Sequence, residues 1–398
     1  MPTTIQTTIA VLGAGPAGIV LAHLLRQHGI DCVIVDAYER EEIYARGRAG
    51  LLESTTVALL NKHQLAEPIF ARGAKHDQCE FRFPDFSMVL EYGKLTGAET
   101  HWTYPQNDLV DDLIQMYLDQ GGTIHFNHPG IAIHNDAEAV SVTCEDKAAG
   151  EKLRIECDFV VGCDGYHGLA RKSVPDAAVS IYNKQHVYGW LAILAQAPPS
   201  TEHIIYALHP EGFAGHMLRS DKISRYYLQV QLADNIDQWN DERIWATLER
   251  RLAKKAWTLN RGQIIEKRML SMRSYVMDPM RYRRLFLAGD VAHIITPCGG
   301  KGMNMAIQDA GVLAEVLNDY YRDAKNPVHL DRYSALRLPM IWRAQEFSYS
   351  MLVMLHKPEV SDPTEGAFLQ KLNESKLAQL LSSETYKRDF ARNYVGII

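Results

Sequence analysis

The sequence predicts an α/β fold in which a Rossmann-like domain is interleaved with an antiparallel β-sheet and followed by a C-terminal helical region. A strand–turn–helix–strand unit with glycines at its turn opens the chain at residues 9–36. Segments that alternate between polar and apolar residues occupy 181–232, as expected of an antiparallel sheet with one solvated face. A short apolar strand at 285–288 then returns late in the chain.

Composition places the chain among ordinary globular proteins and excludes some function classes. Its 398 residues suit two or three domains, and 46% hydrophobic with 23% charged residues is typical of soluble domains. A net charge of −6 argues against a general nucleic-acid binder. The longest apolar stretch, 10–22, is too short to span a bilayer, and the N-terminus lacks the basic start of a signal peptide. We expect a cytoplasmic protein without nucleic-acid or membrane partners.

The six cysteines are scattered along the chain and form no C-x-x-C pair. Most of them fall in apolar, strand-like runs. Buried free thiols in a reducing cytosol are the better interpretation, and we expect no metal ion.

The opening unit has the pattern of a dinucleotide-binding turn. Gly13 suits the tight turn, Gly15 lets the backbone approach a phosphate, and Gly18 lets the helix pack closely on the strand. Asp36 ends the second strand, where it can accept a hydrogen bond from an adenosine ribose. A chance glycine-rich turn is disfavoured because strand, helix and acid are in register. The expected elements are a strand at 9–12, a helix at 16–28 and a strand at 32–35.

The middle of the chain predicts elements that complete this domain. A helix capped by Asn107 should end at Gly121, and a buried strand at 159–162 should run into Asp164-Gly165. By its residues alone, this second Asp-Gly turn is as easily a simple turn as a functional one. Further expected elements are a helix at 51–64 and a hairpin at 78–93 that contains Pro84 and Asp85.

Four alternating segments follow, at 186–194, 203–208, 213–219 and 223–232, and then helices at 242–252, from the loop at 297–302 to about 318, at 329–356 and at 374–391. We predict a cofactor domain at 1–180, whose hairpin 76–100 joins the sheet, a substrate-binding sheet at 181–275, a completion of the first domain at 276–330, and a helical region at 331–398.

Asp290 decides which dinucleotide is expected. One ADP moiety cannot account for both the early turn and the late Gly289-Asp290, whereas a flavin dinucleotide can. The early turn would take the pyrophosphate and Asp290 the ribityl chain. The glycine-rich loop and helix that follow can present N–H groups to the electron-rich edge of a flavin. A merely solvated aspartate would be the better interpretation only without the N-terminal unit.

Three segments are similar to the fingerprints of the class A flavoprotein aromatic hydroxylases: Gly13–Gly18, Cys163–Gly165 and Gly289–Asp290. Within that family the chain most resembles the branch that acts on 4-hydroxybenzoate. The resemblance covers essentially the whole chain and also includes the segments RGRAG at 46–50, GYHG at 165–168, RYY at 225–227 and NYVG at 393–396.

The resemblance implies roles for individual residues around FAD and a nicotinamide nucleotide. Arg225 resembles the residue that holds a mobile isoalloxazine ring, and His167 and Arg273 resemble contacts of NADH or NADPH. The other implied FAD contacts, beyond the turn glycines, are Asp36, Arg46, Arg48, Gln106, Asp164, Asp290, Gly302, Met303 and Asn304.

The resemblance also implies a substrate site. Arg219 and Tyr227 look like a carboxylate clamp, Tyr206 and Tyr394 look like contacts of the para substituent, and Pro297 would offer its carbonyl there. His76 looks like the outer end of a proton relay. Taken alone, Arg219 and His76 would be surface residues and Tyr206 a core tyrosine. A guanidinium in an aromatic pocket needs an anion, however, and a benzoate carboxylate suits its fork geometry.

Two residues of the predicted pocket depart from the family pattern. Met217 stands where a serine is usual, which removes a hydroxyl donor worth about 1 kcal/mol. Cys298 stands where a threonine is expected. A different para substituent is therefore possible, and 4-aminobenzoate is the alternative substrate.

The segment after Asp36 departs as well. Glu39, Glu41 and Glu42 would repel the 2′-phosphate of NADPH, and Arg40 would offset them in part. We therefore expect NADH or dual use.

The expected activity is FAD-dependent hydroxylation of a para-substituted benzoate ortho to its para donor group. The most direct case converts 4-hydroxybenzoate to 3,4-dihydroxybenzoate with NAD(P)H and O2 through a flavin C4a-hydroperoxide. An alternative of another class is a non-enzymatic relative of the GDP-dissociation-inhibitor type, which would not use flavin. Relatives suggest a homodimer, although no motif in the sequence shows one.

Overall fold

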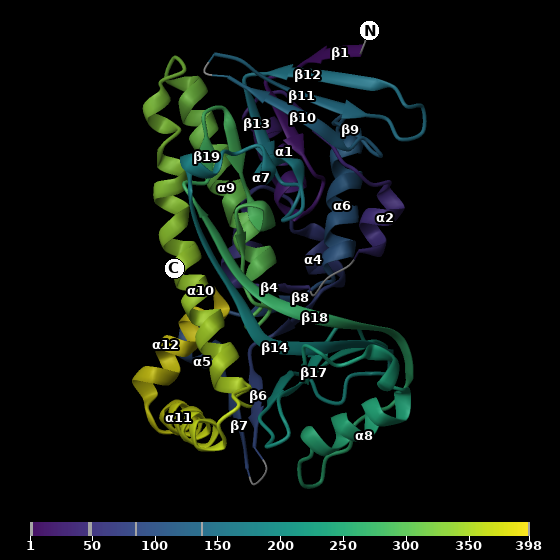
Figure 1. Ribbon diagram of the computed structural model, residues 1–398, viewed down its shortest axis with the longest axis vertical. Coiled ribbons are helices and arrows are strands. Elements are labelled where there is room, and N and C mark those ends of the chain that lie inside the picture. The colour runs from purple at the N-terminus through teal and green to yellow at the C-terminus, as the bar shows by residue number, and fades with distance from the viewer. Residues whose placement is uncertain (1–2, 47–49, 84–85, 137, 397–398) are drawn as a thin grey trace.

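The computed structural model describes residues 3–46, 50–83, 86–136 and 138–396. Arg48 of the predicted cofactor site, and Pro84 and Asp85 of the predicted hairpin, lie outside these residues. Figure 1 shows the Rossmann-like part above and a second sheet below, with strands β14 (Ser180–Gln196) and β18 (Gln263–Asp278) running between them. The second sheet has eight strands.

The Rossmann-like part is built on a six-stranded sheet that is parallel except at one edge. Every residue of β2 (Ile9–Leu12), β3 (Cys32–Val35) and β13 (Phe159–Gly162) is buried, which explains their continuously apolar sequences. The helices α1 and α6 contact each other, and α1 also packs on α9. The strand order is β19 (Arg281–Tyr282), β20 (Leu285–Leu287), β13 (Phe159–Gly162), β2 (Ile9–Leu12), β3 (Cys32–Val35) and β9 (Thr123–His125). The helices are α1 (Pro16–Gln27), α6 (Gln106–Asp119) and α9 (Lys301–Arg322).

The late strand β20 therefore lies beside β13 in the same sheet as the opening strand β2. Because carboxyl ends of parallel strands share one edge, the turns after β2, β13 and β20 are brought together there.

Two small sheets flank this core. The first contains β1 (Thr3–Gln6), β12 (Lys152–Cys157), β11 (Val140–Glu145) and β10 (Gly130–Asn135), and the second contains β4 (Leu51–Leu52), β8 (His101–Thr103) and β5 (Ala74–His76). The short helices are α2 (Arg40–Ala45), α3 (Ser54–Lys62), α4 (Glu67–Arg72), α5 (Tyr92–Thr96) and α7 (Leu169–Lys172). The predicted helix at 51–64 was wrong at its start, because Leu51 and Leu52 pair with β8.

The eight-stranded sheet confirms the second half of the predicted fold, with one difference. Its strands are antiparallel except that β6 and β15 pair in parallel. Strand β6 comes from the N-terminal part of the chain, so it joins through a long crossover rather than a hairpin. The order is β21 (His293–Ile294), β18, β14, β17 (Ser224–Gln231), β16 (Ala214–Leu218), β15 (Ile204–Ala207), β6 (Cys79–Arg82) and β7 (Ser87–Leu90).

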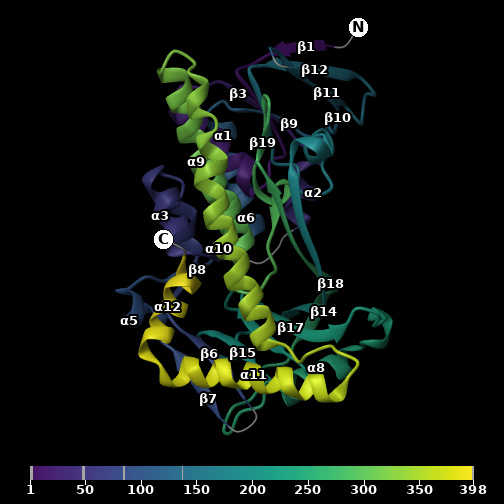
Figure 2. The ribbon, with the colours of Figure 1, turned by 60° about the vertical axis from the view of Figure 1, so that its left-hand side comes forward.

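Four helices cover this sheet and close the chain: α8 (Asp241–Arg251), α10 (Arg332–Leu355), α11 (Pro363–Ser382) and α12 (Glu384–Val395). The predicted helix at 374–391 was wrong, because it is broken at Ser383. That residue is extended, and its hydroxyl caps α12 by accepting from the Tyr386 N–H. Figure 2 shows α10 along the length of the molecule and the C-terminal end returning beside α3.

The prediction that Asn107 caps a helix was also wrong. Helix α6 starts at Gln106 and Pro105 takes the cap position, so the Asn107 side chain is free to point elsewhere. Its oxygen accepts from the guanidinium of Arg219 at 2.8 Å.

All six cysteines are unpaired, with Cys157 and Cys163 half-buried and the rest buried. Over the described residues, no helix has the length and apolarity that a membrane crossing requires.

Buried histidines predict an acid-sensitive fold. Burial lowers the pKa of His76 to about 4 and the pKa of His216 and His356 to about 3. In the unfolded chain their pKa is about 6.5, so below that pH unfolding takes up protons that the folded state excludes. The free energy of unfolding should fall as the pH drops from about 6.5 to about 5, by up to about 4 kcal/mol per pH unit for three imidazoles. Urea denaturation across this window measures the slope, and a flat profile would contradict the prediction.

Candidate active site

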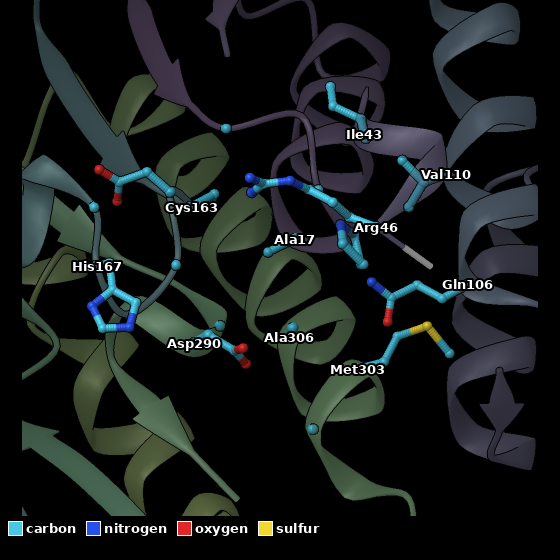
Figure 3. Close-up of a pocket in the computed structure, with 18 of the residues that line it drawn as sticks. Ala17, Ile43, Arg46, Gln106, Val110, Cys163, His167, Asp290, Met303 and Ala306 are labelled. Atoms are coloured by element: carbon cyan, nitrogen blue, oxygen red, sulfur yellow. The ribbon is translucent and has the colours of Figure 1, made fainter. Parts of the chain in front are cut away.

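A cavity of about 870 Å³ is lined by residues from both main sheets. Figure 3 shows Gln106 and Met303 on the opposite side of this cavity from His167 and Asp290. The predicted site residues that line it are Gly13, Gly15, Asp36, Arg46, Gln106, Asp164, His167, Arg225, Tyr227, Asp290, Pro297, Gly302 and Met303. The predicted residues outside its lining are Gly18, His76, Tyr206, Met217, Arg219, Arg273, Asn304 and Tyr394.

The glycines of the Gly13–Gly18 turn allow close backbone packing and leave space in front of the backbone for a dinucleotide. Gly13 has φ +101°, and a Cβ there would lie 2.5 Å from the Cys163 carbonyl oxygen. A Cβ on Gly18 would lie 1.9 Å from the Gly13 carbonyl oxygen, so only glycine permits this close packing. Gly15, the N-cap of α1, has no atom within 4 Å of the corresponding point. The N-terminus of α1 therefore opens into the cavity, as an anion site requires.

Asp36 lines the cavity and is also held by this turn. Its carboxylate accepts from the Ala14 N–H at 2.7 Å and from the Tyr38 N–H at 3.0 Å. Burial raises the pKa of this carboxyl, and the two N–H bonds and the nearby Arg46 lower it in part. The carboxylate is thus fixed at the end of β3, where a ribose hydroxyl can reach it.

Asp164 belongs to the second Asp-Gly turn and caps α7. One carboxylate oxygen accepts from the Ala170 N–H at 3.0 Å, while the other oxygen is buried without a partner among the described residues. Burial raises the pKa of this carboxyl. Asp164 therefore caps α7 with one carboxylate oxygen. Its other oxygen is unpaired among the described residues, and the residue lines the cavity.

Asp290 follows β20, and a buried carboxylate braces its turn from behind. Asp309 of α9 accepts from the Gly289 N–H at 2.9 Å, from His293 Nε2 at 2.6 Å and from Arg337 Nε at 2.7 Å. His293 and Arg337 keep the pKa of Asp309 below its usual range although burial opposes them. Asp309 was missed in the sequence, where it is one more acid in a helix.

Replacing Asp309 with asparagine should loosen this turn and weaken cofactor retention. The substitution leaves the buried Arg337 charge uncompensated, which should cost about 3 kcal/mol of unfolding free energy. We expect lower thermal stability and a lower 450 nm to 280 nm absorbance ratio after gel filtration. Asp319→Asn is the matched control, because Asp319 lies on the same helix in an exposed ion pair with Arg332. Equal FAD retention in both variants would refute the role of Asp309.

The first turn of α9 is the second helix terminus that opens into the cavity. Its N-cap, Gly300, has φ +67° and no side-chain cap, and no atom lies within 4 Å of a Cβ built on Gly302. Asn304 braces this turn from behind: its oxygen accepts from the Glu53 N–H, and its amide donates to the carbonyls of Leu51 and Gly300. Asn304 is thus fully buried and saturated by protein groups rather than exposed to the cavity.

Two arginines lie on the eight-stranded sheet beside the cavity. Arg225 lines the cavity from β17, and Arg219 follows β16 with its guanidinium donating to Asn107. Burial lowers the pKa of Arg219, and the positive charge of Arg225 lowers it further. Because two like charges are held close together, an anion between them and Asn107 would be favoured.

A row of residues crosses the sheet beside these arginines. In register, Tyr206 of β15 opposes Gly215 of β16, which opposes Tyr227 of β17. Neighbouring strands lie about 4.8 Å apart, so the two tyrosines are about 10 Å apart across the glycine. The Met217 methyl group and the Phe213 ring cover Gly215, at 3.2 and 3.0 Å from a Cβ built there. A flexible thioether therefore fills the gap between the tyrosines.

Tyr206 and Tyr394 meet at one end of this row. Their hydroxyl oxygens lie 2.9 Å apart, and both side chains are buried. The Tyr394 carbonyl accepts from His101 Nε2 and from Lys301 Nζ, each at 3.0 Å, which fixes the C-terminal segment. Taken alone, the residues around His76 predicted a surface histidine, which was wrong because Tyr92 and Thr103 cover its ring.

His167 and Arg273 both contact the ring of Tyr166 near the cavity. The ring centroid of Tyr166 is 5.0 Å from the His167 ring and 4.7 Å from the Arg273 guanidinium carbon. The structure therefore brings together two residues that are more than 100 positions apart in the sequence.

The acidic segment at residues 39–42 is less well neutralised by Arg40 than its sequence suggests. Arg40 donates to Asp111 at 2.7 Å and to Gln115 at 2.8 Å, so α6 occupies its guanidinium. Glu39 and Glu42 form a local cap of α2, while Glu41 is exposed.

The N-terminus of α1 suits an anion and the N-terminus of α9 suits an electron-rich ring. Asp36 and Asp290 place a carboxylate beside each, so the site matches the parts of a flavin dinucleotide. This arrangement is that of an FAD-binding oxidoreductase.

Comparisons with known proteins identify the family. Residues 6–348 match the family described as FAD binding domain. The p-hydroxybenzoate hydroxylase of Acinetobacter baylyi is 36% identical over 395 residues, covering 99% of this chain and 96% of that protein. The chain therefore belongs to the FAD-dependent aromatic hydroxylases.

More distant relatives share the fold. A 3-(3-hydroxy-phenyl)propionate/3-hydroxycinnamic acid hydroxylase of Mycobacterium avium is 24% identical over 77% of this chain and 54% of its own length. Among solved structures, p-nitrophenol 4-monooxygenase from Pseudomonas putida has a TM-score of 0.82 at 18% identity and full coverage of both chains. Anhydrotetracycline hydroxylase from Streptomyces rimosus has a TM-score of 0.76 at 20% identity, covering 98% of this chain and 76% of that one.

Proposed function

We propose that this protein hydroxylates a para-substituted benzoate, most directly 4-hydroxybenzoate, ortho to its hydroxyl group with NAD(P)H and O2. The observation that carries the proposal is the row of residues across the eight-stranded sheet beside the cavity, which has phenols at one end and guanidiniums towards the other. Buried phenols of Tyr206 and Tyr394 form one end, and the guanidiniums of Arg219 and Arg225 lie towards the other. The name of the Acinetobacter baylyi relative supports the same ligand.

A benzoate ring matches the register of the sheet. Its carboxylate would face Arg219 and Tyr227, where a guanidinium can bind both oxygens. Its para hydroxyl would face Tyr206, about 10 Å away across Gly215. Met217 would have to turn away from Gly215 to admit the ring, which its flexible side chain allows. Holding the ring at both ends aligns the carbon that is to be hydroxylated.

FAD, when bound, supplies hydride acceptance from the nicotinamide nucleotide and activation of O2. The protein residues would bind and orient FAD and the ligand. The turn at Gly13–Gly18 would hold the pyrophosphate, Asp36 the adenosine ribose and Asp290 the ribityl chain. The open N-terminus of α9 would face the electron-rich edge of the flavin. Tyr206 and Tyr394 would hold the phenolic proton of the ligand.

A panel of benzoates tests the proposal. The purified yellow holoenzyme is given 4-hydroxybenzoate, 4-aminobenzoate, benzoate or 3-hydroxybenzoate, and both nucleotide oxidation and oxygenated product are measured. We expect stoichiometric 3,4-dihydroxybenzoate from 4-hydroxybenzoate. Nucleotide oxidation without product would mark a ligand as an effector only. Colourless protein that does not bind added FAD would refute the assignment altogether.

NADH should be preferred to NADPH. The exposed Glu41 and its neighbours repel a 2′-phosphate, and Arg40 is held by Asp111. We expect kcat/KM to favour NADH by about tenfold, equivalent to about 1.4 kcal/mol. Glu41→Lys should raise kcat/KM for NADPH and leave the value for NADH unchanged. The control is Glu374→Lys, an exposed acid on α11. A strong NADPH preference in the unaltered enzyme would overturn this prediction.

A further inference from the structure

The guanidinium of Arg219 is held by the Rossmann-like part of the chain. Arg219 lies in the turn between β16 and β17, which the Ser220 N–H closes by donating to the Ile223 carbonyl at 3.1 Å. Its guanidinium donates through Nη2 to the side-chain oxygen of Asn107 at 2.8 Å. Asn107 lies in the first turn of α6 and lines the cavity, whereas Arg219 lies outside the lining. The contact therefore joins the two main parts of the molecule at the edge of the cavity.

The neighbouring acid fixes the orientation of the Asn107 amide. The amide nitrogen donates to an Asp108 carboxylate oxygen at 3.1 Å, and the same oxygen accepts from the Tyr44 hydroxyl of α2 at 2.9 Å. A guanidinium has only donors and a carboxylate has only acceptors, so the amide oxygen must face Arg219 and the amide nitrogen must face Asp108. The side chain of Asn107 is thus held at both ends and presents an acceptor to the arginine.

The Asn107 amide supports the arginine without neutralising it. Burial and the nearby Arg225 lower the pKa of Arg219, whereas Asp108 raises it in part. The amide oxygen adds a hydrogen bond but no formal negative charge, so the positive charge of the guanidinium remains available to an incoming anion. A guanidinium carries five N–H donors and Asn107 takes one of them, so this contact leaves the planar fork able to bind both oxygens of a carboxylate.

Holding the arginine side chain in advance strengthens ligand binding. Arginine has several rotatable bonds, whose freedom would otherwise be lost when the ligand binds. Because the contact with Asn107 restricts these bonds beforehand, less entropy is lost on binding. Asn107, Asp108 and Arg219 are each half-buried, so the contact is partly shielded from water.

We propose that Asn107 is a positioning residue that holds Arg219 for the carboxylate of the ligand. This inference rests on the proposed function, because it requires a ligand whose carboxylate binds at Arg219. It gives Asn107 a role in ligand recognition, where the sequence predicted only a helix cap.

The neutral amide at position 107 also favours anionic ligands. An aspartate of the same shape would form an ion pair with Arg219 and would repel a second carboxylate. Asn107→Asp therefore separates positioning from charge, because it keeps an acceptor in place but competes with the ligand.

The test is equilibrium binding. FAD-loaded enzyme is titrated with 4-hydroxybenzoate and with phenol, and the flavin absorbance reports each dissociation constant. We expect Asn107→Ala to raise the dissociation constant of 4-hydroxybenzoate about tenfold. Asn107→Asp should raise it about 100-fold or more, because the new carboxylate occupies Arg219. Phenol, which lacks the carboxylate, should bind the unaltered enzyme and both variants equally.

A double-mutant cycle and a matched control complete the experiment. In an Arg219→Ala background, Asn107→Ala should cause no further loss of affinity, because the residue that it positions is absent. Asn135→Ala is the control. The Asn135 amide is also half-buried and bonded at both ends, donating to the Tyr282 carbonyl and accepting from the Arg284 N–H, but it joins β10 to the turn after β19. This variant should bind 4-hydroxybenzoate normally.

The outcomes separate the role of Asn107 from the function on which it rests. Normal binding of 4-hydroxybenzoate by Asn107→Ala would overturn the positioning role and leave the hydroxylase assignment intact. Equal weakening for phenol and 4-hydroxybenzoate, or a further loss in the Arg219→Ala background, would show a general structural effect and would also overturn it. If the unaltered enzyme binds phenol as tightly as 4-hydroxybenzoate, both the positioning role and the assignment of a carboxylate ligand fail.

Discussion

Tyr206→Phe should bind 4-hydroxybenzoate and still permit flavin reduction but hydroxylate about 100-fold more slowly or worse. The substitution keeps the ring that packs on Phe81 at 5.5 Å and removes the hydroxyl that meets Tyr394. Without that hydroxyl, the phenolic proton of the ligand loses its contact with Tyr206 and its connection to Tyr394, and the ring is a weaker nucleophile. Single-turnover product formation, measured beside the rate of nucleotide oxidation, separates chemistry from binding.

Tyr226→Phe is the matched control for Tyr206→Phe. Tyr226 lies on the opposite face of the sheet, where its hydroxyl is 3.3 Å from the Asn260 carbonyl oxygen. The Tyr226→Phe variant should hydroxylate 4-hydroxybenzoate at the unaltered rate. With 4-aminobenzoate, which carries no acidic proton, Tyr206→Phe should matter much less. Unchanged hydroxylation of 4-hydroxybenzoate by Tyr206→Phe would remove this tyrosine from the proton path.

Arg219→Ala should raise the dissociation constant of 4-hydroxybenzoate about 100- to 1000-fold, equivalent to about 3–4 kcal/mol. The Arg219 side chain is half-buried, and burial together with Arg225 lowers its pKa, so the site favours an anion. Arg219→Lys keeps the charge but loses the planar fork, and we expect an intermediate loss. Titration of ligand binding by flavin absorbance measures all three proteins.

Phenol and Arg250→Ala provide the controls for this result. Phenol lacks the carboxylate, so it should bind the unaltered enzyme and Arg219→Ala equally weakly. Arg250 forms an exposed ion pair with Glu211 on α8, and its loss should leave ligand binding unchanged. If Arg219→Ala binds 4-hydroxybenzoate normally, the carboxylate must lie elsewhere in the cavity.

The fold and the family were predicted from sequence, because their signals are local. The glycines at 13, 15 and 18 and the strands around them lie within one short unit, and their spacing reflects the backbone geometry of one turn. The late Gly289-Asp290 is equally compact. The helix at 374–391 failed for a local reason, because a single cap at Ser383 interrupts an otherwise helical composition.

The residue roles in the substrate pocket and around the flavin remain predictions, although the structure changes what supports them. Asn107 does not cap α6 as predicted, and its side chain instead accepts a hydrogen bond from Arg219, 112 residues away. His76 is buried beside Tyr92, whereas its flanking residues alone predicted a surface position. Neither change could be read from flanking residues, because each depends on which element packs on top.

By itself, the sequence determined the two glycine turns at the strand ends, the order of the strands along the chain and the family to which the protein belongs. Only the tertiary structure decided that Asp309 braces the Gly289 turn and that Tyr206 and Tyr227 face each other across Gly215. The reason is physical: turn geometry is specified by adjacent residues, whereas strand register and buried hydrogen bonds join residues that meet only when the layers close.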